Sequence, residues 1–96
     1  MLNQIVLVGR LTKKPTLKGE RSILTLAVNR AFKNQEGIYE TDFIPVETFG
    51  AVASNTCEYC TKGNIIGVKG RLQNTNNKII VIAEKVTFLS SKKSEE

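Results

Sequence analysis

The sequence predicts a single all-β domain built from five strands and one short helix. Three observations predict it. The chain of 96 residues is long enough for one hydrophobic core only. β-branched and alternating apolar segments recur between short polar turns, and one segment, residues 51–61, lacks that alternation. We therefore expect one folded domain over residues 1–89, followed by a short disordered tail at residues 90–96.

The first three strands follow from their apolar patterns. Residues 5–11 form a β-branched strand, which the polar residues before Pro15 break. Residues 22–32 and 39–49 are predicted as the second and third strands. They flank the polar turn at residues 34–37, so they are expected to pair as a long hairpin.

The second half of the chain contains the helix and two more strands. Residues 51–61 are rich in small residues and end at Lys62 and Gly63, which predicts a short helix with a glycine stop at C′. Strands at residues 64–73 and 78–89 meet through a short polar turn, residues 74–77. Five strands with one helix between the third and fourth is the element order of the OB-fold, a Greek-key barrel whose face often binds oligonucleotides.

Charge and composition narrow the function. The chain carries 14 Lys and Arg against 9 Asp and Glu, a net charge of +5, and it has no histidine. The commonest general base and every His-containing metal site are therefore excluded. Residues 10–33 and 62–85 are basic and flank the acidic residues 34–61. The basic segments could form a stripe that binds nucleic acid or a solvated surface of mixed charge, and charge alone leaves both open.

Cys57 and Cys60 form a C-x-x-C pair and are the only cysteines of the chain. Such a pair could be a redox centre or half of a zinc site. With no histidine and no further cysteine, a four-ligand zinc site would need pairs from two chains. We favour the interpretation that both pack as small apolar residues on one helix face, and we predict no metal and no cofactor.

The third strand shows a clear period of two. Ile44, Val46 and Thr48 fall on one face, whereas Phe43 and Phe49 fall on the other. If the first set faces the core, both phenylalanines stand outside the barrel. Exposed aromatic rings can stack on unpaired bases, or they can pack under a loop or against another subunit. Parity alone leaves these interpretations equal.

Four blocks of the chain, in order, carry a family resemblance. They are the opening residues 1–12, the second-strand residues 24–30 with Phe32, the third-strand residues 41–49, and residues 62–63 with 67–72. Together they resemble bacterial single-stranded DNA-binding proteins of the tetrameric OB-fold type, over nearly all of residues 1–89. The resemblance implies a protein that is not an enzyme and that binds single-stranded DNA with little sequence preference, in DNA replication, recombination or repair.

The resemblance also implies site residues. The implied base-stacking residues are Phe32, Phe43 and Phe49. The implied phosphate contacts are Lys18, Lys33 and Lys62. Phe32 shares its parity with the core residues of the second strand, so a bulge is needed to turn it outward. From charge and parity we add Lys69 and Arg71, which share a strand face, as further phosphate contacts.

Some features depart from the family pattern. The hairpin between the last two strands is shortened and lacks the family's stacking aromatic, so we expect a shorter bound strand and lower affinity. Glu47 lies between Phe43 and Phe49, where a carboxylate repels phosphate, and Pro45 removes a strand N–H beside it. The family's acidic C-terminal tip, which recruits repair and replication enzymes, has no counterpart, so we expect a short form without a recruiting tail.

Oligomeric state follows partly from the first strand. Its apolar side chains lie on both faces, where a barrel needs only one. The resemblance implies that another copy covers the second face, so we expect a homo-oligomer, dimer or tetramer; coverage by the chain's own loops or helix is the alternative. The expected interface residues are Ile5, Val6, Leu7 and Val8.

Two other functions stay in view. One is a primosome-type OB-fold interaction module that acts mainly through a replication protein partner. The other is a nuclease or redox enzyme that uses the cysteine pair, although no carboxylate cluster or phosphate-binding glycine loop supports it. No basic start precedes an apolar run, and no apolar run approaches the roughly 20 residues of a membrane span, so we expect a cytoplasmic protein with no membrane partner.

Overall fold

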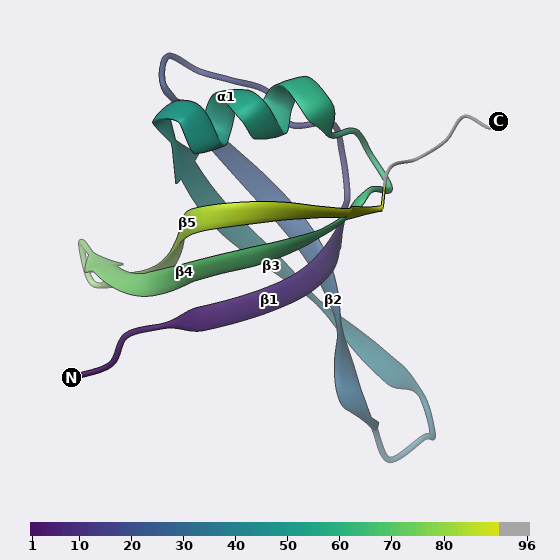
Figure 1. Ribbon diagram of the computed structural model, residues 1–96. Helices are drawn as coiled ribbons and strands as arrows, with labels where there is room; N and C mark the ends of the chain where they lie inside the picture. Colours follow the sequence, from purple (N-terminus) through teal and green to yellow (C-terminus); the bar gives the residue numbers. More distant parts are fainter. Residues whose placement is uncertain (91–96) are drawn as a thin grey trace, which may run out of the picture.

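The computed structural model describes residues 1–90, and it confirms five strands with one helix between the third and the fourth (Figure 1). The elements in chain order are β1 (Ile5–Leu11), β2 (Arg21–Lys33), β3 (Tyr39–Phe49), α1 (Gly50–Tyr59), β4 (Ile65–Thr75) and β5 (Lys78–Ser90). Within residues 1–90, no helix is long and apolar enough to cross a membrane.

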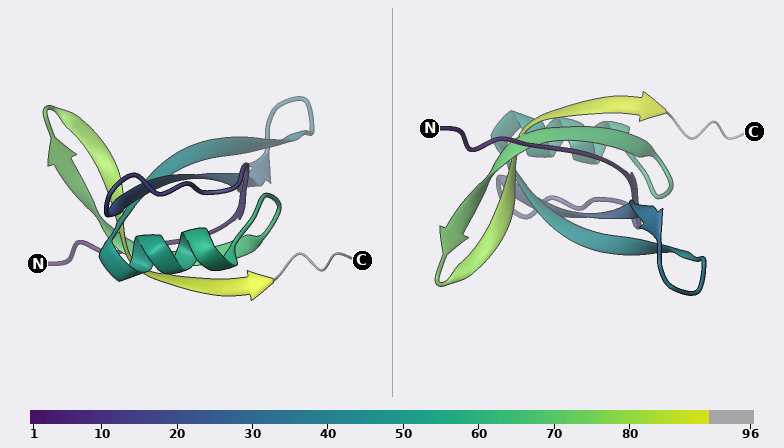
Figure 2. Two further views of the ribbon diagram at one scale, coloured as in Figure 1. Left: turned by 90° about the horizontal axis from the view of Figure 1, so that it is seen from above. Right: turned by 90° about the horizontal axis from the view of Figure 1, so that it is seen from below.

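The five strands close into a barrel in the order β1-β2-β3-β5-β4. All pairings are antiparallel except that between β3 and β5, which is parallel. The predicted OB-fold is therefore confirmed. Helix α1 and the loop of residues 12–20 lie side by side over one end of the barrel, whereas the β2–β3 hairpin projects from the other (Figures 1 and 2).

Alternate positions of the strands build the core. On β3, Val46 and Thr48 are fully buried and Ile44 packs against the core, as the period of two predicts. The hydroxyl of Thr48 donates a hydrogen bond of 2.8 Å to the carbonyl of Ser22, so this buried polar group is satisfied. The core residues that are at most 1% exposed are Leu11, Leu24, Leu26, Val46, Ala53, Ile66 and Val68.

The helix ends earlier than predicted. Cys60 is the C-cap residue and has extended backbone angles, φ −115° and ψ 153°. Gly63 lies three residues further on with φ 92°, and its N–H donates a 2.9 Å hydrogen bond to the carbonyl of Leu11. The prediction that Gly63 is the C′ residue is wrong. This glycine instead turns the chain back against β1, in a conformation that side chains disfavour.

The β4–β5 hairpin has a tighter turn than the sequence predicts. The strands continue to Thr75 and Lys78, and only Asn76 and Asn77 remain in the turn. Both asparagines have positive φ, 53° and 66°, which is the type I′ geometry that matches the twist of paired strands. Strand β5 includes Ser90, so the predicted tail begins one residue too early; its other residues, 91–96, lie outside the described residues.

Candidate nucleic-acid interface

The outward side chains of β2 and β3 form one continuous surface, which we call the strand face. Its cross-strand pairs are Arg21 with Phe49, Ile23 with Glu47, Thr25 with Pro45 and Ala27 with Phe43. Phe43 is 65% exposed and Phe49 is 45% exposed, although Val46 and Thr48 between them are buried. The two rings therefore stand at opposite ends of the strand face, outside the core.

Phe32, the third predicted stacking residue, lies on the projecting part of the β2–β3 hairpin. Its side chain is 84% exposed. The strand register shifts between Asn29 and Lys33, where three residues of β2, positions 30–32, lie opposite Glu40 alone. A register irregularity thus lies at Phe32, but residues 30–33 of β2 are all exposed, because the hairpin projects from the barrel here (Figure 1).

Glu47 does not stand alone on the strand face. Its Oε2 lies 3.3 Å from Nη2 of Arg21, whose side chain is 51% exposed, whereas that of Glu47 is 17% exposed. The carboxylate and the guanidinium thus offset each other's charge. Sequence reasoning did not select Arg21, because its pairing with β3 depends on a register that only the folded sheet defines.

A basic hollow of about 320 Å³ lies beside the strand face. Its cationic residues are Lys13, Lys14, Lys18 and Arg21, and Ser22 and Ile23 complete the wall with Thr16. Lys18 and Arg21 exchange two backbone hydrogen bonds, of 2.8 and 3.1 Å, which closes the loop before β2. Lys18, a predicted phosphate contact, therefore lies in the same hollow as three further cations. From the sequence, these three were not selected as site residues and were indicated only as part of the basic segment at residues 10–33.

Lys62 lies at the same end of the barrel. It is exposed in the turn after α1, and its neighbours Gly63 and Asn64 exchange backbone hydrogen bonds with Leu11. The chain continues from Leu11 into the segment that contains Lys13 and Lys14. Lys62 thus follows α1 beside the strand end that leads to Lys13 and Lys14, but it does not itself line the basic hollow.

A second hollow, of about 520 Å³, is lined by Phe49. Arg71 lines it together with Arg21 and Glu47, so this residue is on the same side of the molecule as the strand face. Its Nε lies 3.4 Å from Oε2 of Glu84, which offsets part of its charge.

Lys69 is placed differently from Arg71. Although the two residues share the parity of β4, the cross-strand neighbours of Lys69 are Val6 on β1 and Lys85 on β5. It lines neither hollow. The structure therefore separates Lys69 from Lys18 and Arg71, which line the two hollows, and Lys33 lies apart from both hollows on the β2–β3 hairpin opposite Tyr39.

The first strand has two different faces. Ile5 and Leu7 are partly buried and pack against the barrel core. Val6 is 66% exposed and Val8 is 54% exposed. Of the four residues predicted for an oligomer interface, only Val6 and Val8 lie on an open face, because alternate side chains of a strand point to opposite sides.

The cysteines occupy a structural position between α1 and the barrel. Cys60 is 3% exposed within the core, and burial, with a smaller contribution from Cys57, raises the pKa of its thiol. Cys57 is half-buried, and its sulfur lies 3.4 Å from the hydroxyl oxygen of Ser22. Both thiols are free. Within residues 1–90, no three His, Cys, Asp or Glu side chains gather closely enough to hold a metal ion.

An OB-fold barrel with exposed rings on its strand face and basic hollows beside it defines a class of protein suited to single-stranded nucleic acid. Residues 2–88 match the sequence pattern of the Single-strand binding protein family, and the chain belongs to this family.

Two relatives match almost end to end. Single-stranded DNA-binding protein 1 of Clostridium acetobutylicum is 42% identical over 107 aligned positions, which cover 96% of this chain and 97% of the relative. Single-stranded DNA-binding protein B of Bacillus subtilis is 39% identical over 110 positions, which cover the whole chain and 97% of the relative.

Two solved structures share the fold. A deletion mutant of the single-stranded DNA-binding protein from Thermus aquaticus is 30% identical with a TM-score of 0.71; the match covers 93% of this chain and 51% of that one. The present chain thus spans about half of the Thermus aquaticus chain. The small single-stranded DNA-binding protein from Streptomyces coelicolor has a TM-score of 0.69 at 19% identity, which shows a common fold.

Proposed function

We propose that this protein binds single-stranded DNA with little sequence preference and without catalysis, through base stacking on the strand face. The observation that carries the proposal is the exposure of Phe43 and Phe49 on the outward side of β3, whereas the inward residues Val46 and Thr48 between them are buried. Every base has a π-face, so stacking on such rings tolerates any sequence. The relatives, named single-stranded DNA-binding proteins, support the same proposal.

Phosphate contacts are proposed at the basic hollow and at isolated cations around the strand face. Lys13, Lys14 and Lys18 lie together with Arg21 beside one end of it, and Lys62 is close by. Arg71 lines the second hollow together with Phe49. Cations at these places neutralise phosphates and release counterions, which makes the affinity dependent on salt.

A role in DNA replication, recombination or repair, in the cytoplasm, is the broader proposal that goes with such binding. We further propose that the exposed face of β1, with Val6 and Val8, meets a second copy of the chain in a dimer or tetramer. Light scattering at micromolar concentration tests this assembly. A monomer at that concentration would overturn it, and a Val6→Glu variant is expected to dissociate the oligomer because it buries a charge.

The binding proposal is tested by fluorescence anisotropy with labelled oligo-dT and with duplex of equal length. Phe43→Ala and Phe49→Ala are each expected to weaken binding by roughly 1–3 kcal/mol. Tyr59→Ala is the matched control, because this ring is 64% exposed but lies on α1, away from the strand face. Circular dichroism checks that the variants stay folded. Equal affinity for duplex and single strand would refute the proposal and favour a protein-interaction module.

A further inference from the structure

We propose that Tyr39, together with Lys33, is an additional stacking site for an unpaired DNA base on the β2–β3 hairpin, and that Arg30 positions it. The proposal rests on the proposed function, since it assumes that single-stranded DNA lies along the strand face. It adds a residue that neither the apolar pattern nor the family resemblance singled out.

Tyr39 continues the outward row of β3 beyond the barrel. Tyr39, Thr41 and Phe43 alternate along the strand and pair with Lys33, Asn29 and Ala27 on β2, so they share one side of the hairpin. At ~3.3 Å per residue, Tyr39 lies about 13 Å along the strand from Phe43. Its side chain is 54% exposed. A track of rings thus runs from Phe49 through Phe43 to Tyr39.

Lys33 supplies the charge that a nucleotide needs at this point. Its Nζ lies 5.7 Å from the centroid of the Tyr39 ring, which is within the range of a cation–π contact. The contact restrains the ring, and the same ammonium group is placed to neutralise the phosphate of a nucleotide stacked there. An aromatic ring and an adjacent cation are the two elements of sequence-independent recognition of single strands.

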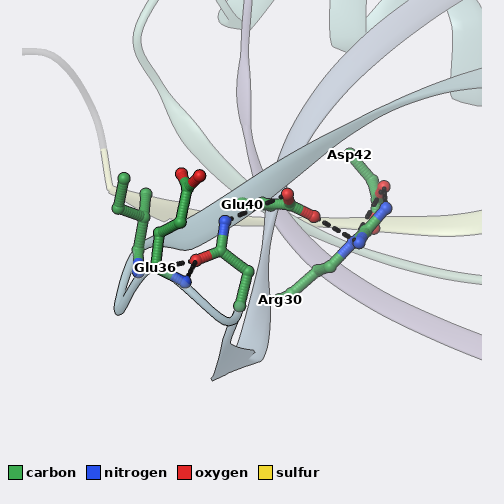
Figure 3. Close-up of polar contacts among 6 residues, drawn as sticks. Arg30, Glu36, Glu40 and Asp42 are labelled. Atoms are coloured by element: carbon green, nitrogen blue, oxygen red, sulfur yellow. Dashed lines mark hydrogen bonds and ion pairs between the residues drawn. The ribbon is translucent and has the colours of Figure 1, made fainter.

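The opposite side of the hairpin carries a cluster of charged side chains, which we call the Arg30 clamp. Arg30 donates from Nε to Oδ2 of Asp42 at 3.1 Å and from Nη2 to Oδ1 at 2.9 Å, and its Nη1 donates to Glu40 (Figure 3). Arg30, Glu40 and Asp42 alternate with the residues of the Tyr39 row, so parity places them on the other side. Two carboxylates that would repel a phosphate are therefore turned away from the row and paired with one guanidinium.

The clamp is continuous with the turn of the hairpin. Asn34 donates from Nδ2 to Oε2 of Glu40 at 3.2 Å, and its Oδ1 accepts the N–H groups of Glu36 and Ile38 at 2.8 and 3.0 Å (Figure 3). These bonds connect both strands and the turn. A hairpin ordered before DNA arrives loses less conformational entropy on binding, so we assign Arg30 the role of a positioning residue.

The composition of the chain allows a direct test. It contains no tryptophan and only two tyrosines, Tyr39 and Tyr59. In a Tyr59→Phe variant all tyrosine emission comes from Tyr39. Titration with unlabelled oligo-dT is expected to quench this emission, because stacking on a base quenches the ring. The matched control is Tyr39→Phe, whose emission comes from Tyr59 at 6.2 Å from Phe88 and is expected to change little.

The affinity measurements are made with labelled oligo-dT on the full chain. Tyr39→Leu is expected to bind roughly tenfold more weakly than Tyr39→Phe, which keeps the ring. If Tyr59→Phe binds the oligonucleotide without quenching of Tyr39, or if Tyr39→Leu binds as tightly as Tyr39→Phe, the stacking site is overturned while the proposed function stands. If no variant binds the oligonucleotide, the proposed function itself fails.

The role of Arg30 has a separate readout. Arg30→Gln in the Tyr59→Phe background removes the ion pairs that order the hairpin. The ring of Tyr39 is then held less firmly in line with Phe43 and Phe49, so its quenching at saturating DNA is expected to be lower. Arg30→Lys restores one positive charge without the two-point contact to Asp42, so partial rescue is expected. Unchanged quenching in Arg30→Gln would overturn the positioning role.

Discussion

Glu47 is the residue whose replacement tests the description of the strand face most sharply. Its carboxylate lies between Phe43 and Phe49 along β3 and forms an ion pair with Arg21 at 3.3 Å. Glu47→Gln keeps the size of the side chain and removes its charge. The change removes a repulsive charge from the proposed path of the DNA and releases Arg21 to contact a phosphate.

The expected magnitude follows from counterion release. Each phosphate contacted on a single strand changes the slope of log K against log[salt] by about −0.7. One additional contact by Arg21 therefore steepens the slope of the variant by about 0.7 relative to wild type. Between 1 M and 0.1 M salt, the affinity of the variant then rises about fivefold more than the affinity of wild type. The cost to folding is small, because ion pairs of this exposure contribute about 1 kcal/mol or less.

The assay is anisotropy of labelled oligo-dT at several salt concentrations for wild type and two variants. Glu58→Gln is the matched control, because it makes the same charge change at an exposed position of helix α1. The steeper slope is expected in Glu47→Gln alone. An unchanged slope in Glu47→Gln, or an equal gain in Glu58→Gln, would refute the reasoning that Glu47 offsets Arg21 on a DNA-binding face.

Three further predictions concern the fold. Gly70→Ala should destabilise the barrel in urea by roughly 1–3 kcal/mol, since a Cβ there overlaps the carbonyl of Ile82. Gly67→Ala should be tolerated, since a Cβ there meets nothing nearer than Leu89 at 3.5 Å. The Arg30 guanidinium lowers the pKa of Asp42, so NMR should find its titration below the ordinary value and nearer to it in Arg30→Gln; the clamp's contribution to stability is present at neutral pH and is lost as the pH falls through the lowered pKa. Cys60, buried and with a raised pKa, should react with iodoacetamide far more slowly than Cys57 in the folded protein, and equal labelling by mass spectrometry would contradict its burial.

Local patterns were enough for the order of the elements and for the two faces of β3. The period of two that buries Val46 and exposes Phe43 and Phe49 is a property of any strand, so it can be read from neighbouring residues alone. The sequence predicted a turn at residues 74–77, and the structure has only residues 76–77 in the turn. The shorter turn was not predicted, because the positive φ of its two asparagines depends on the pairing of the two strands.

Contacts between distant segments were decided by the tertiary structure. The ion pair of Arg21 with Glu47 joins residues on two strands, and its existence depends on the register of β2 against β3. The basic hollow forms because the loop before β2 folds back on that strand. Local periodicity does not predict contacts between residues that are far apart in the chain. Counting charges therefore located the basic segments but did not predict which side chain pairs with each cation.

The sequence by itself determined a small β-barrel with aromatic residues on an outer strand face, because alternation and turn chemistry act over a few residues. The tertiary structure decided which charges on that face remain free, where Phe32 and Tyr39 lie on the projecting hairpin, and which side of β1 is left open. These features depend on strand register and barrel closure, which bring together residues far apart in the chain.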